Sequence, residues 1–185
     1  MVHAFEGNKA ETRTMLPVVQ AFMAAHQLPE VTVVADAGMM SEQNLKDLED
    51  AGLEIVVGAR IPEVPYQVAQ WQREHPGEPI ADQQIVIQPW IMGPNADQRK
   101  RTIFYQYRAN RARRTLHGID QQVAKAEKAV AGQVAIKRNR FIQLSGGTRT
   151  VNRELEAKTR ALAGLKGYIT NLDAPTADFV IGAYH

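Results

Sequence analysis

Val31-Thr32-Val33-Val34-Ala35-Asp36-Ala37-Gly38 is the stretch of sequence that decides the expected fold. Its first five residues are apolar or β-branched without interruption, which is typical of a strand buried on both faces of a parallel sheet. The next three residues have the short side chains that end a strand in a turn. We therefore expect a buried strand over residues 31–35 that carries an acidic side chain at its carboxyl end.

A helix and a second strand follow this first strand. Ser41 is placed to cap a helix that runs to about Ala51, and Gly52 ends it. Residues 53–58 form another short apolar run of the buried-strand type. Strand, helix and strand in this order predict parallel pairing with a right-handed crossover. The first 60 residues are therefore expected to belong to an α/β domain.

The rest of the chain is predicted to combine short elements with one long helix. Residues 62–94 contain both tryptophans and six of the nine prolines, so we expect short pieces there. The predicted helices cover residues 11–26, 66–73, 109–131 and 152–165, and a last one follows its cap, Thr176. The predicted strands cover residues 84–88, 101–108 and 167–171, and residues 145–148 form a turn.

Composition excludes several classes of protein and site. The chain is 44% hydrophobic and 23% charged, which is typical of a globular protein. Cys is absent, so disulfides, thiolate nucleophiles and Cys-based zinc sites are excluded. The sequence contains neither an apolar run of membrane-spanning length nor the apolar start of a secretion signal. We therefore expect a cytoplasmic protein with no membrane partner.

Charge is distributed unevenly along the chain. Residues 1–98 carry 5 Lys and Arg against 14 Asp and Glu, a net charge of −9. Residues 99–166 carry 17 Lys and Arg against 4 Asp and Glu, a net charge of +13, and residues 167–185 add −2. The basic block needs counter-charge, either from the acidic first part or from a polyanion such as DNA. Charge alone leaves both interpretations open.

The long helix predicted over residues 109–131 has an apolar seam and a basic side. Its apolar residues are spaced for packing against a neighbouring element: Leu116, Ile119, Val123, Ala126 and Val130. Its basic residues are predicted to point the other way: Arg111, Arg114, Lys125 and Lys128. The basic side is either a solvated outer surface or a surface that lies along DNA.

Few residues in the sequence are candidates for catalysis or for metal binding. The five histidines are scattered without metal-ligand spacing, and the sequence has neither a phosphate-binding P-loop nor a Gly-x-Ser-x-Gly elbow. Asp36 follows a strand at the edge where α/β sheets bind ligands, so its carboxylate is a candidate Mg²⁺ ligand. An Asp after a strand also commonly serves as a turn or helix-capping residue. Spacing does not decide between these roles.

Several segments together resemble the DDE transposases of bacterial insertion sequences, most closely the "IS-four" type group. The segments that carry the resemblance are residues 5–11 (FEGNKAE), 33–39 (VVADAGM), 101–114, 167–171 (GYITN) and 183–185 (AYH). In that family the Tyr of the last segment opens a Tyr-x-x-Arg-x-x-x-Glu pattern whose Glu is the third catalytic acid. The order and spacing of the segments follow the family pattern over nearly the whole chain.

The resemblance implies a partial ribonuclease H-like α/β fold with an α+β insertion. Residues 1–60 would be part of the catalytic core, 61–166 the insertion, and 167–185 the return to the core. Asp36 would be the second catalytic and metal-binding acid, with the first Asp before Met1 and the final Glu beyond His185. The cofactor would be Mg²⁺ or Mn²⁺, present in the complete enzyme. Because one carboxylate does not confine two cations, we expect this chain alone not to cleave or join DNA.

The resemblance also implies transposon-end DNA as the partner, in a bacterial, nucleoid-associated protein. Lys137, Arg138, Arg140 and Arg149 cluster around the predicted turn and are the first candidates for phosphate contacts. Two alternatives remain: a non-catalytic nucleic-acid-binding module, and a protein-interaction domain that pairs through the seam at residues 116–130. A sheet without its first strands would expose an apolar edge, so we also expect self-association.

Overall fold

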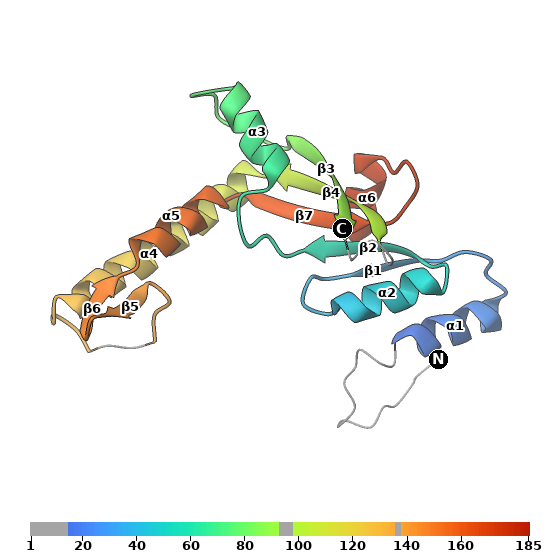
Figure 1. Cartoon of the computed structure of the whole chain (residues 1–185), viewed down its shortest axis with the longest axis horizontal. Coiled ribbons are helices and arrows are strands. Elements are labelled where there is room, and N and C mark those ends of the chain that lie inside the picture. Colours follow the sequence, from blue (N-terminus) through green and yellow to red (C-terminus); the bar gives the residue numbers. More distant parts are fainter. Residues whose placement is uncertain (1–14, 93–97, 136–137) are drawn as a thin grey trace. The chain divides into compact units, whose positions relative to one another are not determined.

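The computed structural model describes residues 15–92, 98–135 and 138–185 (Figure 1). The described residues form a mixed α/β protein with six helices. They cluster into two compact units, which are considered separately. Unit 1 comprises the described residues within 1–60, 87–104 and 167–185, and unit 2 comprises those within 61–86 and 105–166. Residues 87–104, which we expected in the insertion, therefore group with unit 1. The division into a partial core (1–60), an insertion (61–166) and a return to the core (167–185) remains a prediction.

Most of the predicted elements are present in the structure. The helices are α1 (Met15–His26), α2 (Glu42–Asp50), α3 (Tyr66–Glu74), α4 (Ala109–Val130), α5 (Arg153–Ala161) and α6 (Ala177–Tyr184). The strands are β1 (Thr32–Ala35), β2 (Glu54–Ala59), β3 (Ile85–Met92), β4 (Arg99–Tyr107), β5 (Ile142–Ser145), β6 (Thr148–Val151) and β7 (Leu165–Thr170). The apolar and β-branched runs became strands, and the segments with helical periodicity became helices.

The main sheet has five strands in the order β1-β2-β7-β4-β3. β1 and β2 are parallel, with Val33 opposite Ile55, so the predicted parallel pair is confirmed. β2 and β7 are antiparallel, with Val57 opposite Ile169, which makes the sheet mixed. The side chain of Asn171, just after β7, fixes this pairing further, because it accepts from the Ile55 N–H at 2.8 Å and donates to the Leu53 carbonyl at 3.0 Å.

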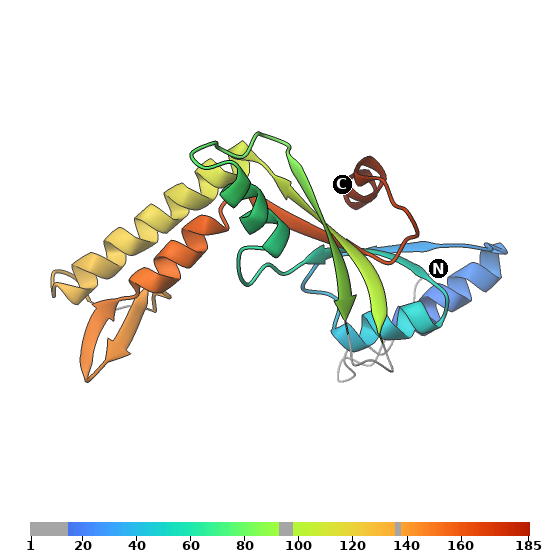
Figure 2. The ribbon, with the colours of Figure 1, turned by 45° about the horizontal axis from the view of Figure 1, so that its top comes forward.

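Helices cover both faces of the parallel pair in unit 1, with α2 and α6 on opposite sides (Figures 1 and 2). The α2 face is the apolar core, in which Leu45 and Leu48 pack against Ile55 and Val57. Ser41 caps α2 as predicted, because its Oγ accepts the Asn44 N–H at 3.2 Å. Side chains alternate along β1, so Asp36 lies on the face opposite this core.

A buried arginine ties β4 to α2 in unit 1. The Arg101 side chain has no exposed surface, although sequence patterning gave no sign of its burial. Its guanidinium donates to both carboxylate oxygens of Glu49, at 2.7 and 3.0 Å, and to Glu42 at 3.1 Å. Burial disfavours the charge, but the hydrogen bonds and negative charges of Glu49 and Glu42 outweigh it, so the pKa of Arg101 is raised. Arg101 is therefore a fully paired structural cation.

Unit 2 contains α4, α5 and a small two-stranded sheet. The apolar seam of α4 packs against this sheet and α5, where Ile119, Val123 and Ala126 enclose Phe141. β5 and β6 form an antiparallel hairpin, which we did not predict beyond its turn. Both central residues of the turn, Gly146 and Gly147, have positive φ, at 57° and 82°, which favours glycine there. The hairpin covers the seam that the protein-interaction hypothesis required to be exposed.

The helix predicted over residues 152–165 is shorter in the structure. α5 ends at Ala161, and Gly164 has a φ of 91°, a conformation that L side chains rarely adopt. A Cβ at Gly164 would lie 2.5 Å from Cε2 of Tyr107, so the ring also requires glycine at this position. The chain therefore leaves the helix early and enters β7 at Leu165.

In the described ranges, each helix is too short or too polar to cross a lipid bilayer.

Candidate functional site

Asp36 lies directly after β1, at the carboxyl end of the parallel pair. Its side chain is exposed, and its carbonyl accepts the Met39 N–H at 3.0 Å to close a turn. The Asp36 Oδ1 atom also accepts the Ala37 N–H at 2.8 Å. Asp36 therefore takes part in the turn that we had considered as its alternative role, and its carboxylate faces solvent at the sheet edge predicted for ligands.

Tyr184 reaches the same carboxylate from the other end of the chain. Its hydroxyl donates to Asp36 Oδ1 at 2.5 Å, across a separation of 148 residues. Its ring packs edge-on against the ring of Tyr168, with centroids 5.1 Å apart, and Tyr168 is fully buried. Thr176 accepts the Phe179 N–H and caps α6 as predicted, which fixes the helix that carries Tyr184. Sequence reasoning placed Tyr184 in a family motif but gave no contact with Asp36.

Gly58 leaves the space in which these two side chains meet. A Cβ at this position would lie 3.0 Å from the Tyr184 hydroxyl, 3.1 Å from Asp36 Oδ1 and 3.0 Å from the Ala37 nitrogen. Such contacts are tighter than ordinary van der Waals contacts, so a side chain here would push the carboxylate or the phenol aside by a few tenths of an ångström. The close approach explains a glycine in an otherwise apolar buried strand.

The Asp36 carboxylate has the oxygen ligands that Mg²⁺ prefers, but it is not part of a complete metal site in the described residues. The described ranges contain no group of three His, Cys, Asp or Glu side chains that could hold a metal ion. Asp36 Oδ1 already accepts two hydrogen bonds. The described residues therefore do not by themselves fit the two-cation site that the resemblance implies.

The contact between Asp36 and Tyr184 should affect the titration of Tyr184 and the stability of the fold at high pH. Partial burial of the phenol, and then its hydrogen bond to Asp36 and the carboxylate charge, raise the pKa of Tyr184 from 10.0 to about 12. Because the folded-state pKa is the higher one, stability from the neutral phenol is present below pH 10 and is lost as pH rises toward 12.

An ultraviolet titration of tyrosinate in wild type and Tyr184→Phe isolates this group by difference. We expect the Tyr184 component near pH 12 in wild type and at lower pH in Asp36→Asn, in which the negative charge is gone. An unshifted component in Asp36→Asn would contradict the coupling of the two side chains.

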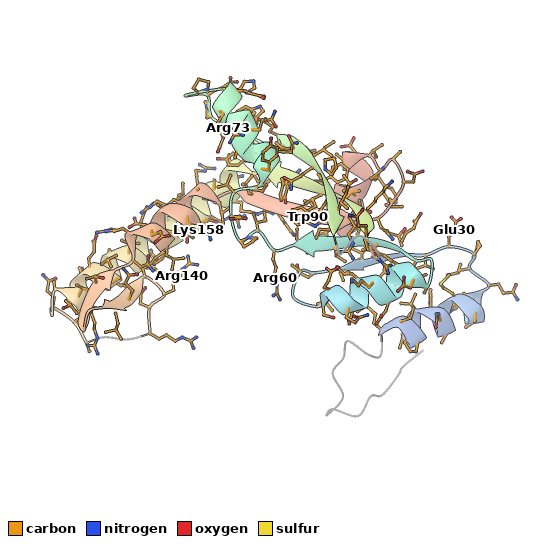
Figure 3. All side chains as sticks on the ribbon, viewed as in Figure 1. Glu30, Arg60, Arg73, Trp90, Arg140 and Lys158 are labelled. Atoms are coloured by element: carbon orange, nitrogen blue, oxygen red, sulfur yellow. The ribbon has the colours of Figure 1, made fainter. Side chains whose placement is uncertain are left out.

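The predicted DNA-binding residues come from the hairpin and the segment before it. Lys137 lies outside the described residues. Arg138 and Arg140 are exposed ahead of β5, and Arg149 is exposed on β6; Arg140 is labelled in Figure 3. The guanidinium of Arg140 lies 4.7 Å from the centre of the Phe141 ring, which is a cation–π contact. Arg138 lines a hollow together with Lys125 of α4.

The hairpin arginines differ from those of α5 in their partners. Arg153 donates to Glu127 and Glu156, and Arg160 pairs with Asp120 and Glu156. These carboxylates raise the pKa of both arginines, mainly through hydrogen bonds. In the described part of the chain, Arg138, Arg140 and Arg149 have no such ion pair. Their charge is therefore free to attract an anion.

No family model matches this chain, and neither does a curated protein or a solved structure.

Proposed function

We propose that this chain is part of a metal-dependent DDE transposase with a ribonuclease H-like core, and that Asp36 is one of its three catalytic acids. The observation that carries the proposal is the meeting of Asp36 and Tyr184 at the carboxyl end of β1. The family resemblance gives these two segments the second acid and the start of the helix with the third. A contact between them is what a shared catalytic centre requires.

The position of β1 in the sheet also supports the proposal. In the described sheet β1 is an edge strand, with β2 as its parallel neighbour. A further strand that carries the first acid would pair along the outer edge of β1, where the described sheet ends. The remaining two acids are thus proposed to come from segments outside these 185 residues.

The experiment that tests this function is strand cleavage by the complete protein. The substrate is a duplex that carries the inverted repeats flanking the reading frame, with Mg²⁺ or Mn²⁺ as the cation. We expect cleavage at the repeat ends that leaves 3′-hydroxyl groups, and chelation by EDTA should abolish it. Absence of end-specific cleavage under either cation would contradict the proposal.

DNA is the partner that the proposal assigns to the basic residues near the hairpin. Changing Lys137, Arg138, Arg140 and Arg149 together to Ala should weaken duplex binding about tenfold or more, and each lost phosphate contact should lower the salt slope by about 0.9. Fluorescence anisotropy at several salt concentrations measures both quantities. A control removes four exposed charges elsewhere: Arg60, Arg73, Lys100 and Lys158. Equal losses in the two variants would contradict a specific role for the hairpin region.

The second candidate function is a non-catalytic nucleic-acid-binding module. It is favoured by the same three arginines, Arg138, Arg140 and Arg149, which form no ion pair within the described ranges, and it makes no use of Asp36. The cleavage assay separates the two candidates, because the module binds DNA without cutting it. With either function, a DNA partner would place the protein at the bacterial nucleoid.

A further inference from the structure

The exposed face of α4 carries a continuous polar stripe. The stripe consists of Asn110, Arg113, Arg114, His117, Gln121, Lys125 and Lys128. From Asn110 these residues recur at helical spacing, with Arg113 beside Arg114, so they share one side of the helix. All seven are exposed, whereas Ile119, Val123 and Ala126 on the opposite side are buried. At about 1.5 Å per residue, the stripe is about 27 Å long.

The acidic residues of α4 lie off this stripe. α4 contains two, Asp120 and Glu127, and both face α5. Asp120 accepts from Arg160 at 2.6 Å and Glu127 accepts from Arg153 at 2.5 Å. The ion pairs of α4 therefore stay on its α5 flank. Residues 105–166 carry 14 Lys and Arg against 4 Asp and Glu, and α5 arginines already pair with three of those acids.

The cations of the stripe have no acidic partner in the described structure. Arg113 donates to the Asn110 side chain, and Arg114 contacts the Asn110 carbonyl at 3.4 Å. Arg113, Arg114 and His117 line an open hollow with Asn110. At the other end, Lys125 and Arg138 line a second hollow, so Arg138 lies near that end of the stripe. The basic residues of α4 thus form a charged surface without internal neutralisation.

Arg111 does not belong to this surface, although its sequence position suggested that it did. It is half-buried, and its Nη1 atom is enclosed without a hydrogen-bond partner in the described residues. The stripe therefore includes Arg113, which the sequence pattern did not select, and excludes Arg111.

We propose that the α4 stripe binds the phosphate backbone of duplex DNA. The cations of the stripe extend from Arg113 to Lys128, about 22 Å along the helix, which corresponds to six or seven base-pair steps of B-DNA at roughly 3.4 Å per phosphate along each strand. Amide and imidazole groups between the cations supply further hydrogen bonds to phosphate oxygens. The inference rests on the proposed DNA partner, but it does not depend on Asp36, on a metal ion or on the hairpin residues.

The test changes Arg114, Lys125 and Lys128 together to Gln in the 185-residue chain. Gln is a good helix former, so α4 should persist, and circular dichroism checks this. Binding to a labelled duplex of arbitrary sequence is measured by anisotropy between about 50 and 200 mM salt. We expect the dissociation constant to rise about 100-fold near 0.1 M salt and the salt slope to fall by about 2 to 3.

The matched control changes Arg60, Arg73 and Lys158 to Gln, which removes the same charge from exposed positions on other elements (Figure 3). We expect it to bind DNA within a few-fold of wild type. A stripe variant that binds like wild type, or like the control, would overturn the inference and leave the hairpin assignment standing. Failure of the wild-type chain to bind duplex at the lowest salt would overturn the DNA partner itself. Preferential binding of double-stranded RNA in competition would overturn the choice of DNA.

Discussion

Replacing Asp36 by asparagine should lower DNA strand cleavage by about a thousandfold or more in the complete protein. The change removes a negative charge that the proposed site uses to hold a cation, and loss of such a cation costs several kcal/mol of transition-state stabilisation. Asparagine keeps an oxygen that can accept from Tyr184 and from the Ala37 N–H, so the local fold should persist. The measurement is a single-turnover cleavage rate with saturating Mg²⁺.

Glu30 supplies the matched control for this experiment. It is an exposed carboxylate just ahead of β1, so it precedes the same strand that Asp36 follows (Figure 3). Glu30→Gln should cleave DNA at close to the wild-type rate. A cleavage rate that Asp36→Asn leaves unchanged would remove Asp36 from the catalytic centre, whereas equal losses in both variants would point to a general effect on DNA binding or folding.

Replacing Arg101 by methionine should lower the free energy of unfolding by about 3 to 5 kcal/mol. Glu49, which is nearly as buried as Arg101, would lose the hydrogen bonds from Arg101, at 2.7 and 3.0 Å, and keep the longer contact with Arg99, at 3.8 Å. Removal of one partner from a buried ion pair has a cost of this size. Urea denaturation of the 185-residue chain measures the difference.

Arg99→Met is the comparison variant, because Arg99 lies on the same strand and its closest partner is Asp50, which is 60% exposed, whereas its contact with Glu49 is longer, at 3.8 Å. An ion pair with an exposed carboxylate contributes about 0 to 1 kcal/mol, so we expect a smaller loss than in Arg101→Met. The double variant Arg101→Met, Glu49→Leu should recover much of the lost stability, since an apolar pair can replace a buried ion pair. Similar losses in Arg101→Met and Arg99→Met would contradict the account of the buried pair.

Local features of the sequence were enough to predict most elements. Ser41 and Thr176 cap the helices that they were expected to cap, and the apolar run before Asp36 is a strand. The strand, helix and strand order correctly predicted a parallel pair, because a short connection through one helix favours that topology. These predictions depend on residues that are close in the sequence.

Features that depend on distant residues could not be predicted. The insertion of β7 between β2 and β4, and the burial of Arg101 against α2, bring together segments more than 50 residues apart. The hairpin strands were not predicted because Gln143 and Arg149 interrupt their apolar pattern. Their apolar residues pack against α4, which lies at a distance in the sequence. Gly164 ended α5 early because of the Tyr107 ring, which no local pattern near residue 164 indicates.

In the candidate site too, the feature that depends on nearby residues could be predicted and the contacts between distant residues could not. Asp36 could be selected because it follows a buried strand, which is a local feature. The Tyr184 hydroxyl and the space at Gly58 became apparent only in three dimensions, since 148 residues separate Tyr184 from Asp36. Among the basic residues, sequence patterning identified the charged region but not which cations pair with α5, and so it selected Arg111 rather than Arg113.

Cation-specific rescue of Asp36→Cys in the complete protein tests most directly whether this side chain binds the catalytic metal. These 185 residues contain no native Cys, so the substitution introduces their single thiol, a soft ligand. We predict that Asp36→Cys is inactive with Mg²⁺ alone and regains cleavage when a thiophilic cation such as Mn²⁺ or Cd²⁺ is added, whereas Asp36→Ser does not. Full activity of Asp36→Cys with Mg²⁺ alone, or equal behaviour of the Cys and Ser variants with Cd²⁺, would contradict the assignment of Asp36 as a metal-binding catalytic acid.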